Sequence, residues 1–257
     1  MTDTTQTSKI AIITGASRGL GRSMALHLAA QGVAILGTYR SREADAQAVA
    51  AEIRSHGVPA AMLPLDTGDT STFPAFATTL TATLRDTFGR SDADFLVNNA
   101  GIGVYTPFAD TTEEQFDDLI RVQLKGPYFL TQTLLPLIVD GGRILNVSTG
   151  LTRFTTPGYS AYAAAKGAIE VLTRYQAKEL GTRRITVNTI APGVIETDFA
   201  GGHARDNADL NRMLAGTISL GRVGLPDDIG AAVATLLGEG SGWITGQRIE
   251  VSGGQNL

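Results

Sequence analysis

The stretch from Lys9 to Leu28 constrains the fold more than any other part of the 257-residue chain. An apolar run from Ile10 to Ile13 leads into a glycine-rich turn, Thr14 to Gly21, and then into a run with helical spacing of apolar residues. A buried strand that passes through such a turn into a helix forms a cradle for phosphate. Free N–H groups and the positive end of the helix dipole meet at that point.

Each glycine of this turn has a predicted task. Gly15 lets the chain leave the strand sharply, Gly19 lets backbone amides approach a pyrophosphate, and Gly21 lets the helix pack closely on the sheet. The spacing is G-x-x-x-G-x-G and not the more common G-x-G-x-x-G. Because the chain contains 30 glycines, an ordinary strand-to-helix turn is the alternative interpretation of this stretch alone.

Composition excludes several classes of protein. Hydrophobic residues make up 43% and charged residues 18%, which is typical of a globular domain. A net charge of −4 argues against a nucleic-acid surface, and the lack of cysteine excludes disulfides and a cysteine nucleophile. No apolar run is long enough for a membrane helix, and the polar residues 1–8 predict a frayed tail and not a signal peptide. These features favour a cytoplasmic protein without a membrane partner.

Strand and helix patterns alternate along the chain. Apolar runs predict strands at 10–13, 33–39, 60–65, 93–97, 143–147, 185–190 and 247–251. Helical patterns lie between most of them, at 42–56, 70–88, 113–137, 159–180 and 227–237. The region 113–137 is either one long helix or a bent pair, since Pro127 and Pro136 interrupt it, and Gly181 is expected to cap the helix that precedes it.

This alternation predicts an α/β fold in which one doubly wound, seven-stranded parallel sheet carries helices on both faces. Residues 9–257 are expected to form a single domain. Right-handed crossovers place every strand-to-helix turn at one edge of the sheet, where ligands bind. The stretch 197–217 is predicted to be long and irregular at that edge, and is either a lid or simply a long loop.

Tyr162 and Lys166 lie four residues apart and therefore share one face of the helix predicted at 159–180. A lysine cation about 4 Å from the phenol contributes on the order of 4 kcal/mol at an effective dielectric constant of 20. Such a contribution lowers the pKa of the tyrosine by roughly 3 and makes it a usable general acid. A surface pair is the alternative, although the chain has only four lysines.

Four motifs together resemble the short-chain dehydrogenase/reductase family over nearly the whole chain. They are Thr14–Gly21, Asn98-Asn99-Ala100-Gly101, Tyr162-x-x-x-Lys166 and Pro192-Gly193-Val194-Ile195-Glu196-Thr197. The resemblance implies a Rossmann fold, NAD(P)(H) binding and hydride transfer between a carbonyl and an alcohol. It implies that Asn99, Ala100 and Gly101 line the adenosine-ribose side, with Asp66 near the adenine. Ile195 and Thr197 would hold the nicotinamide end, and Lys166 its ribose.

Two positions depart from the family pattern. The family usually has a serine 13 residues before the tyrosine, and Thr149 stands there, preceded by Ser148. Thr149 keeps the hydroxyl that orients a substrate oxygen, whereas Ser148 would need the loop to shift by one residue. The family asparagine that supports a proton relay is replaced by Gln123, which offers the same groups one methylene further out.

Cofactor choice is predicted from the end of the second strand. An acidic residue there favours NAD and a basic one favours NADP, and this chain has Tyr39-Arg40-Ser41. Arg40, together with Arg18, is expected to face a 2′-phosphate, so NADP(H) is favoured over NAD(H). The alternative is that both arginines are solvated. The full set of predicted cofactor contacts is Gly15, Ser17, Arg18, Gly19, Leu20, Gly21, Tyr39, Arg40, Ser41, Asp66, Asn99, Ala100, Gly101, Tyr162, Lys166, Pro192, Gly193, Ile195 and Thr197.

The sequence thus predicts an NADP-dependent carbonyl reductase or alcohol dehydrogenase, with Tyr162 as general acid/base and no metal. A 3-oxoacyl carrier-protein reductase is the first alternative, and the pair Arg183-Arg184 is its one candidate basic patch. A sensor that binds NADP(H) without turnover is the second. The resemblance also implies a homotetramer or homodimer with the helices at 113–137 and 159–180 in the interface. Trp243, before the last strand, is expected to serve packing.

Overall fold

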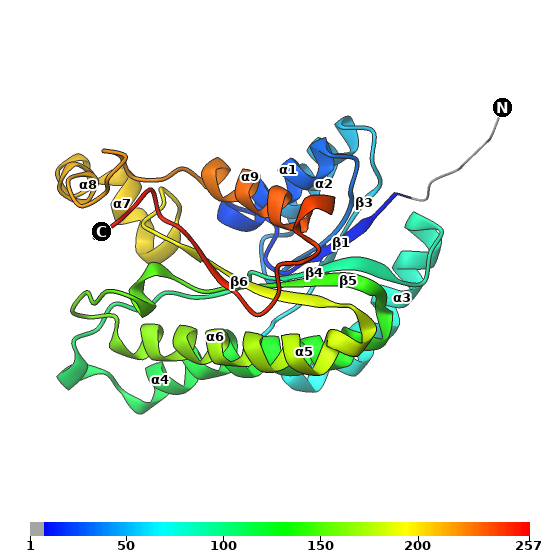
Figure 1. The fold of residues 1–257 in the computed structure, drawn as a ribbon, viewed down its shortest axis with the longest axis horizontal. Coiled ribbons are helices and arrows are strands. Elements are labelled where there is room, and N and C mark those ends of the chain that lie inside the picture. The colour runs from blue at the N-terminus through cyan, green and yellow to red at the C-terminus, as the bar shows by residue number, and fades with distance from the viewer. Residues whose placement is uncertain (1–7) are drawn as a thin grey trace.

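A computed structural model describes residues 8–257, and the tail expected at 1–8 lies outside them except for Ser8. The described residues form one seven-stranded parallel sheet, as predicted, and its strands lie in the order β3-β2-β1-β4-β5-β6-β7 (Figure 1). Its strands are β1 (Ile10–Ile13), β2 (Ala34–Tyr39), β3 (Ala60–Pro64), β4 (Ala93–Asn98), β5 (Ile138–Val147), β6 (Thr186–Pro192) and β7 (Arg248–Val251).

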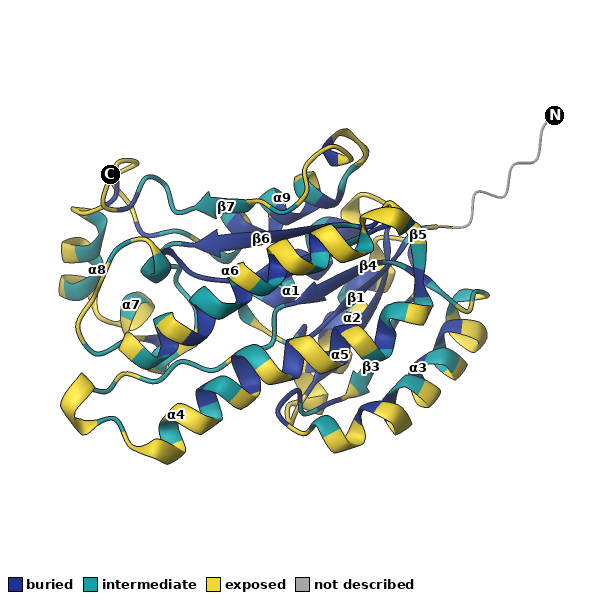
Figure 2. Ribbon diagram, turned by 60° about the horizontal axis from the view of Figure 1, so that its bottom comes forward, coloured by how far each residue is buried: buried dark blue, intermediate teal, exposed yellow. Residues whose placement is uncertain are grey.

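Helices cover both faces of this sheet (Figure 1). One layer consists of α1 (Gly19–Ala30), α2 (Glu43–Ser55) and α9 (Pro226–Leu237). The opposite layer consists of α3 (Phe73–Phe88), α4 (Glu113–Ile120), α5 (Gly126–Leu134) and α6 (Ser160–Leu180). Two shorter helices, α7 (His203–Asp206) and α8 (Ala208–Ala215), lie beside the end of the sheet toward which the β6 arrow points (Figure 2).

The inner strands are largely apolar because both of their faces are buried. Along β1, Ile10 and Ile12 pack with α3, α5 and α6, whereas Ala11 and Ile13 pack with α1, α2 and α9. Figure 2 shows the consequence, since the inner strands are buried, the edge strand β7 is intermediate, and exposed residues gather on the outer sides of the helices.

The order of the strands reverses between β1 and β4. In an open α/β sheet, the crevice outside the carboxyl ends of the strands at this switch point is where ligands bind. The glycine-rich turn follows β1 and the Asn99-Ala100-Gly101 segment follows β4, so the topology brings both motifs to this crevice. No helix within the described part of the chain has the length and apolarity to cross a bilayer.

The prediction of an irregular segment at 197–217 was wrong. Two short helices, α7 and α8, occupy most of it, and they follow a kinked turn at Phe199–Gly202 in which Ala200 and Gly201 are left-handed. Asn207 starts α8 by accepting hydrogen bonds from the N–H groups of Asp209 and Leu210 at 3.1 and 3.0 Å. The glycine- and polar-rich composition that suggested a loop therefore supplies helix caps and tight turns instead.

The predicted helix at 113–137 is divided into α4, a π-helical turn at Arg121–Lys125 and α5, and ends in a 3₁₀ turn at Leu135–Leu137. Pro127 lacks the N–H that would bond to the carbonyl of Gln123, which loosens the helix at this turn. π-Helical turns are rare and are often found at functional sites.

Three smaller predictions also needed correction. Strand β5 begins at Ile138, five residues before the predicted start at 143. Gly181 follows α6 but is right-handed with φ −59°, and the left-handed residue that ends the turn is Arg184 with φ +55°. Trp243 does not pack, because 99% of it is exposed.

Candidate active site

The glycine-rich turn has the backbone that the sequence predicted. Gly15 and Gly19 are left-handed, with φ +67° and +55°. A Cβ on Gly21 would lie 2.2 Å from the carbonyl oxygen of Gly15, so only glycine fits there. Helix α1 begins at Gly19 with no side chain capping it and no acidic residue in its first turn. Its N-terminal amides and dipole are therefore suited to an anion, and the cradle fits a dinucleotide pyrophosphate.

Thr14 and Asn99 join this turn to the end of β4. The Thr14 hydroxyl oxygen accepts hydrogen bonds from the N–H groups of Asn99 and Ala100, both at 2.9 Å. The Asn99 amide in turn donates to the Thr14 carbonyl at 2.8 Å and to that of Gly15 at 3.2 Å. Asn99 thus braces the phosphate cradle in addition to lining the site. The sequence analysis assigned no role to the Thr14 side chain, although a hydroxyl at the end of a strand is suited to bind the backbone of a neighbouring strand.

The segment after β6 closes the same crevice from the other side. The Thr197 methyl carbon lies 3.8 Å from where a Cβ on Gly19 would stand, so Thr197 faces the phosphate cradle. Gly193 lies so close to Ser252 that a Cβ would approach that residue to 2.8 Å. Ile195 pairs with Gly224 in a short parallel bridge. The structure therefore brings the 192–197 motif to the glycine turn, as expected.

The predicted phosphate-binding arginines differ in their surroundings. Arg40 is exposed at the end of β2, beside the buried Tyr39, and has no hydrogen-bonding partner among residues 8–257. Arg18 instead forms an ion pair of 2.9 Å with Asp198, which also binds Arg205. The expectation that Arg18 is free to face a 2′-phosphate therefore does not match this conformation. Near the end of β3, Asp66 accepts a hydrogen bond from the Gly68 N–H at 2.8 Å.

Tyr162 and Lys166 lie on one side of α6 and are both buried, with 6% and 5% exposure. The Lys166 ammonium donates a hydrogen bond of 2.7 Å to the carbonyl of Val147, the last residue of β5. Burial lowers the pKa of Lys166 to about 7. A surface pair, the alternative interpretation of this spacing, is therefore excluded.

The pKa of Tyr162 is raised and not lowered. Burial raises it most, a hydrogen bond with the Thr149 side chain lowers it, and Tyr159 raises it slightly further. The sequence argument expected the lysine cation to dominate. In the structure the desolvation of the phenol dominates instead, because the closely packed α6 and β5 exclude water from both side chains.

Thr149, and not Ser148, stands beside Tyr162. The Ser148 hydroxyl donates to a carboxylate oxygen of Glu170 at 2.7 Å, on the other side of the strand end. The Thr149 side chain lies close enough to Tyr162 to lower the pKa of the phenol, and its hydroxyl oxygen accepts a hydrogen bond from the Leu151 N–H at 3.3 Å. Successive residues of an extended chain point in opposite directions, so the two hydroxyls cannot exchange places without a shift of register.

Gln123 lies in the π-helical turn and is 1% exposed. Its amide nitrogen donates to the Ile102 carbonyl, whereas its Oε1 atom is buried without a hydrogen-bonding partner in residues 8–257. A buried acceptor of this kind requires a donor, such as a bridging water. Gly101 packs directly on this amide, since a Cβ there would approach Gln123 Oε1 to 2.8 Å. The structure thus brings Gln123 to the Asn99–Gly101 segment.

Aromatic rings surround Tyr162. The ring centroid of Phe199 lies 5.5 Å from that of Tyr162, and the Tyr159 centroid lies 6.3 Å from it. Tyr105 packs edge-on against Tyr159 at 5.4 Å. Gly103 and Gly158 leave room for these rings, since a Cβ on either would approach Phe199 or Tyr105 to 2.3 Å. Phe199 belongs to the segment 197–217, for which the sequence left open a lid or a long loop.

Cavity size does not mark this site. A hollow of about 1010 Å³ lies at the amino ends of the strands, lined by charged residues such as Lys9, Arg85, Arg90 and Asp94. The pocket that Tyr162 lines, together with residues such as Val104 and Leu119, is much smaller. The chemistry of the side chains, and not the volume, therefore identifies the site.

Comparisons with known proteins agree with this geometry. A family model described as "Enoyl-(Acyl carrier protein) reductase" matches residues 15–256. The hydroxynaphthalene reductase-like protein Arp2 of Metarhizium brunneum is 35% identical, over 96% of this chain and 94% of that protein. The NADPH-dependent aldehyde reductase-like protein of Arabidopsis thaliana chloroplasts is also 35% identical, over 96% of this chain and 93% of that protein. Among solved structures, the angucycline C-6 ketoreductase LanV with bound NADP superposes with a TM-score of 0.91, at 36% identity over 97% of this chain and 96% of that one.

Proposed function

Since this chain belongs to the short-chain dehydrogenase/reductase family and is an oxidoreductase, we propose that it reduces a ketone or aldehyde to an alcohol with NADP(H). One observation carries the proposal. A buried tyrosine, Tyr162, lies beside the Thr149 side chain, which lowers the pKa of the phenol, at the sheet edge where the glycine turn forms its phosphate cradle. This arrangement can protonate an oxygen beside a bound dinucleotide.

In this mechanism the Thr149 hydroxyl orients the carbonyl oxygen, and the Tyr162 hydroxyl donates the proton that makes it an alcohol. Reduced nicotinamide, when bound, supplies the hydride. Burial favours the protonated form of Tyr162, which suits a proton donor. Lys166 stands one helical turn away, with a pKa near neutrality. The Oε1 atom of Gln123 has no hydrogen-bonding partner within residues 8–257, so it can accept a hydrogen bond from a water. Such a water can pass on the proton that restores the Tyr162 hydroxyl after it has donated its own.

The residues that would hold the cofactor come from six segments of the crevice. The pyrophosphate would rest on Gly15–Gly21, and the adenosine on Tyr39–Ser41, Asp66 and the Asn99–Gly101 segment. The nicotinamide end would lie between Tyr162, Lys166 and the 192–197 segment. The preference for NADP(H) rests on Arg40, because no acidic residue ends β2 and this guanidinium is exposed and unpaired within residues 8–257.

We expect Arg40→Ala to weaken NADPH binding by about 10- to 100-fold, because a guanidinium–phosphate contact is lost, and to leave NADH binding nearly unchanged. Titration of protein fluorescence with each cofactor measures both affinities. Arg42→Ala is the matched control, since Arg42 is exposed nearby but pairs with Asp45 at 3.3 Å. An equal loss for NADPH and NADH would contradict the proposed cofactor preference.

We further propose that the substrate is a ketone on a flat aromatic ring system. The rings of Tyr105, Tyr159 and Phe199 line the approach to Tyr162 and can stack with such a molecule. Relatives at about this identity include a hydroxynaphthalene reductase-like protein and an angucycline ketoreductase, which is consistent with that chemistry.

The experiment that tests the function follows NADPH oxidation with a panel of carbonyl compounds: aliphatic ketones and aldehydes, bicyclic aromatic ketones and a carrier-bound 3-oxoacyl thioester. We expect the highest kcat/KM for the aromatic ketones. Turnover restricted to the thioester would favour the carrier-protein alternative. Arg183 is poorly suited to bind an acidic carrier protein, because its guanidinium already pairs with Asp140 at 2.7 Å. Binding of NADPH without turnover of any compound would favour the sensor.

We also propose that the protein is a homotetramer or homodimer. The outer sides of α4, α5 and α6 expose large apolar residues, namely Phe116, Tyr128, Phe129, Val171 and Tyr175, which are 41–64% exposed. An apolar patch of this kind is typical of an interface between subunits. Analytical ultracentrifugation should give a mass of two or four chains, and replacement of Tyr128 and Tyr175 by glutamate should reduce it. A monomeric wild type would contradict this proposal.

A further inference from the structure

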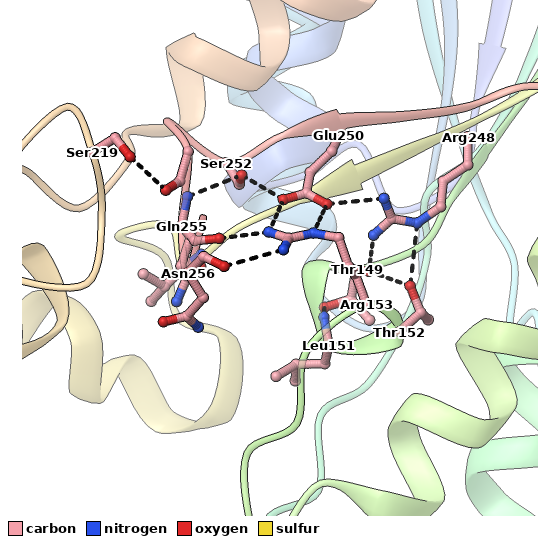
Figure 3. Close-up of polar contacts among 12 residues, drawn as sticks. Thr149, Leu151, Thr152, Arg153, Ser219, Arg248, Glu250, Ser252, Gln255 and Asn256 are labelled. Carbon is pink, nitrogen blue, oxygen red and sulfur yellow. Dashed lines mark hydrogen bonds and ion pairs between the residues drawn. The ribbon is translucent and has the colours of Figure 1, made fainter.

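Two arginines and two glutamates form a network behind Thr149, of which Figure 3 shows Arg153, Arg248 and Glu250. Arg248 on β7 bonds to Glu170 on α6 at 2.8 Å and to Glu250 on its own strand at 2.9 Å. Arg153, just after the Thr149 loop, pairs with Glu250 through two nitrogens at 2.7 and 2.8 Å. The four side chains are 14–35% exposed, and their charges cancel. None of them belongs to the predicted site.

The network holds the backbone of the Thr149 loop. Arg248 Nη2 donates to the Thr149 carbonyl at 3.2 Å, and the Thr152 hydroxyl approaches the same carbonyl at 3.0 Å (Figure 3). Glu170 holds the neighbouring Ser148 hydroxyl at 2.7 Å. Arg248 thus fixes the carbonyl of Thr149, and Glu170 fixes the side chain of Ser148 just before it. Because Thr149 itself is extended, its hydroxyl then points toward Tyr162.

The same network reaches the segment proposed to hold the nicotinamide. Arg153 donates to the carbonyls of Gln255 and Asn256 at 2.5 and 3.2 Å. The side-chain oxygen of Gln255, which is 5% exposed, accepts from the Val194 N–H at 3.0 Å. The residues after β7 thus connect the Thr149 loop with the 192–197 segment. These two parts of the crevice lie far apart in the sequence.

Glu250 strengthens this arrangement because it is held as an anion. Its hydrogen bond with Arg153 contributes most to lowering its pKa to about 2, with further contributions from Ser252 and Arg248. Bidentate and charge-assisted hydrogen bonds fix angles as well as distances. A network of this kind is suited to holding a loop in a single conformation.

We propose that Arg248, braced by Glu170 and Glu250, is a positioning residue that keeps the Thr149 hydroxyl aligned with Tyr162 for proton transfer. Arg248 acts through the Thr149 backbone and touches neither the phenol nor the proposed cofactor site. The inference rests on the proposed carbonyl reduction. A small misplacement of a group that orients the reacting atoms costs rate more than binding.

The test is a double-mutant cycle between Arg248→Met and Thr149→Val, measured as kcat with NADPH and an aromatic ketone. Arg248→Met keeps the bulk of the side chain and removes its hydrogen bonds. We expect it to lower kcat by about 10- to 100-fold with little change in the Kd for NADPH. In the Thr149→Val background, where there is no hydroxyl left to align, we expect the same change to have less than about a threefold effect. Arg248→Lys should restore part of the activity.

Arg90→Met is the matched control, since Arg90 forms a comparable ion pair of 2.7 Å with Asp94 at the amino ends of the strands, away from the site. It should leave kcat unchanged. If Arg248→Met lowers kcat equally in both backgrounds, or weakens NADPH binding as much as it lowers kcat, the positioning role is overturned and Arg248 only supports the fold.

A structural readout separates this inference from the proposed function. If the wild type reduces no carbonyl in the panel, the proposed function fails. Crystal structures of the wild type and Arg248→Met then decide the inference without activity. A Thr149–Tyr162 hydrogen bond that is lost in the variant supports the positioning role, and one that is retained overturns it.

Discussion

Replacement of Tyr162 by phenylalanine should lower kcat for carbonyl reduction by about 10²- to 10⁴-fold, the usual contribution of a positioned general acid. The change removes only the hydroxyl that donates the proton. The ring would still fill its place between Tyr159 and Phe199, and the buried packing of α6 on the sheet would remain. The Kd for NADPH should therefore stay nearly constant. Steady-state kinetics and a cofactor titration on the same preparation measure both quantities.

Tyr159→Phe is the control for this variant. Tyr159 is the nearest other phenol, and it lies at the start of α6 with its ring centroid 6.3 Å from that of Tyr162. Its loss should alter KM for an aromatic ketone more than kcat, because it lines the approach and donates no proton in the proposed mechanism. An equal fall of kcat in both variants, or a loss of NADPH binding in Tyr162→Phe that matches its loss of turnover, would contradict the role given to Tyr162.

The fold followed from the sequence because its strands carry a strong local signal. A strand buried on both faces is apolar along most of its length, and the run at 10–13 shows this directly. The glycine-rich turn could also be predicted from the sequence, because Gly21 lies so close to Gly15 that no side chain fits at position 21. The prediction for 197–217 was wrong because the helices there are short and depend on capping residues such as Asn207. Composition alone does not distinguish such capping residues from loop residues.

The sequence predicted which residues meet at the site, but it did not predict their pKa values. The spacing of Tyr162 and Lys166 predicted a shared helix face, but not that Lys166 reaches the Val147 carbonyl or that burial dominates both pKa values. The choice between Ser148 and Thr149 depends on Glu170, a partner 22 positions further along the chain. Such partners are set by tertiary packing. No local pattern in the sequence indicated them, or the exposure of Trp243.

Lys166→Met should abolish most turnover and, at the same time, stabilise the fold in a way that depends on pH. Turnover should fall because the ammonium beside the nicotinamide ribose and Tyr162 is lost. Stability should rise because a buried cation is costly: the folded-state pKa of Lys166 is about 7, compared with an ordinary value of 10.5. A shift of this size corresponds to at most about 5 kcal/mol, from which the lost hydrogen bond to Val147 must be subtracted.

The sign of the pH dependence follows from proton linkage. Between pH 7 and 10.5 the unfolded wild type binds more protons than the folded one, so its stability rises with pH in that window. Below pH 7 both states are protonated and the full cost is present. The methionine variant lacks this titration, so its advantage should be largest below pH 7 and should shrink steadily toward pH 10.5. The loss of the hydrogen bond to Val147 lowers the advantage by a similar amount throughout.

Urea unfolding of the wild type and of Lys166→Met at pH 6, 8 and 10 measures this advantage directly. Lys178→Met is the matched control, because Lys178 is exposed in the last turn of the same helix and should show no such pH dependence. A constant difference between Lys166→Met and the wild type across this range would mean that Lys166 carries its charge in the folded protein as readily as in water. The buried ammonium would then be solvated or paired in solution, and the packing of α6 on β5 would be looser than the structure shows.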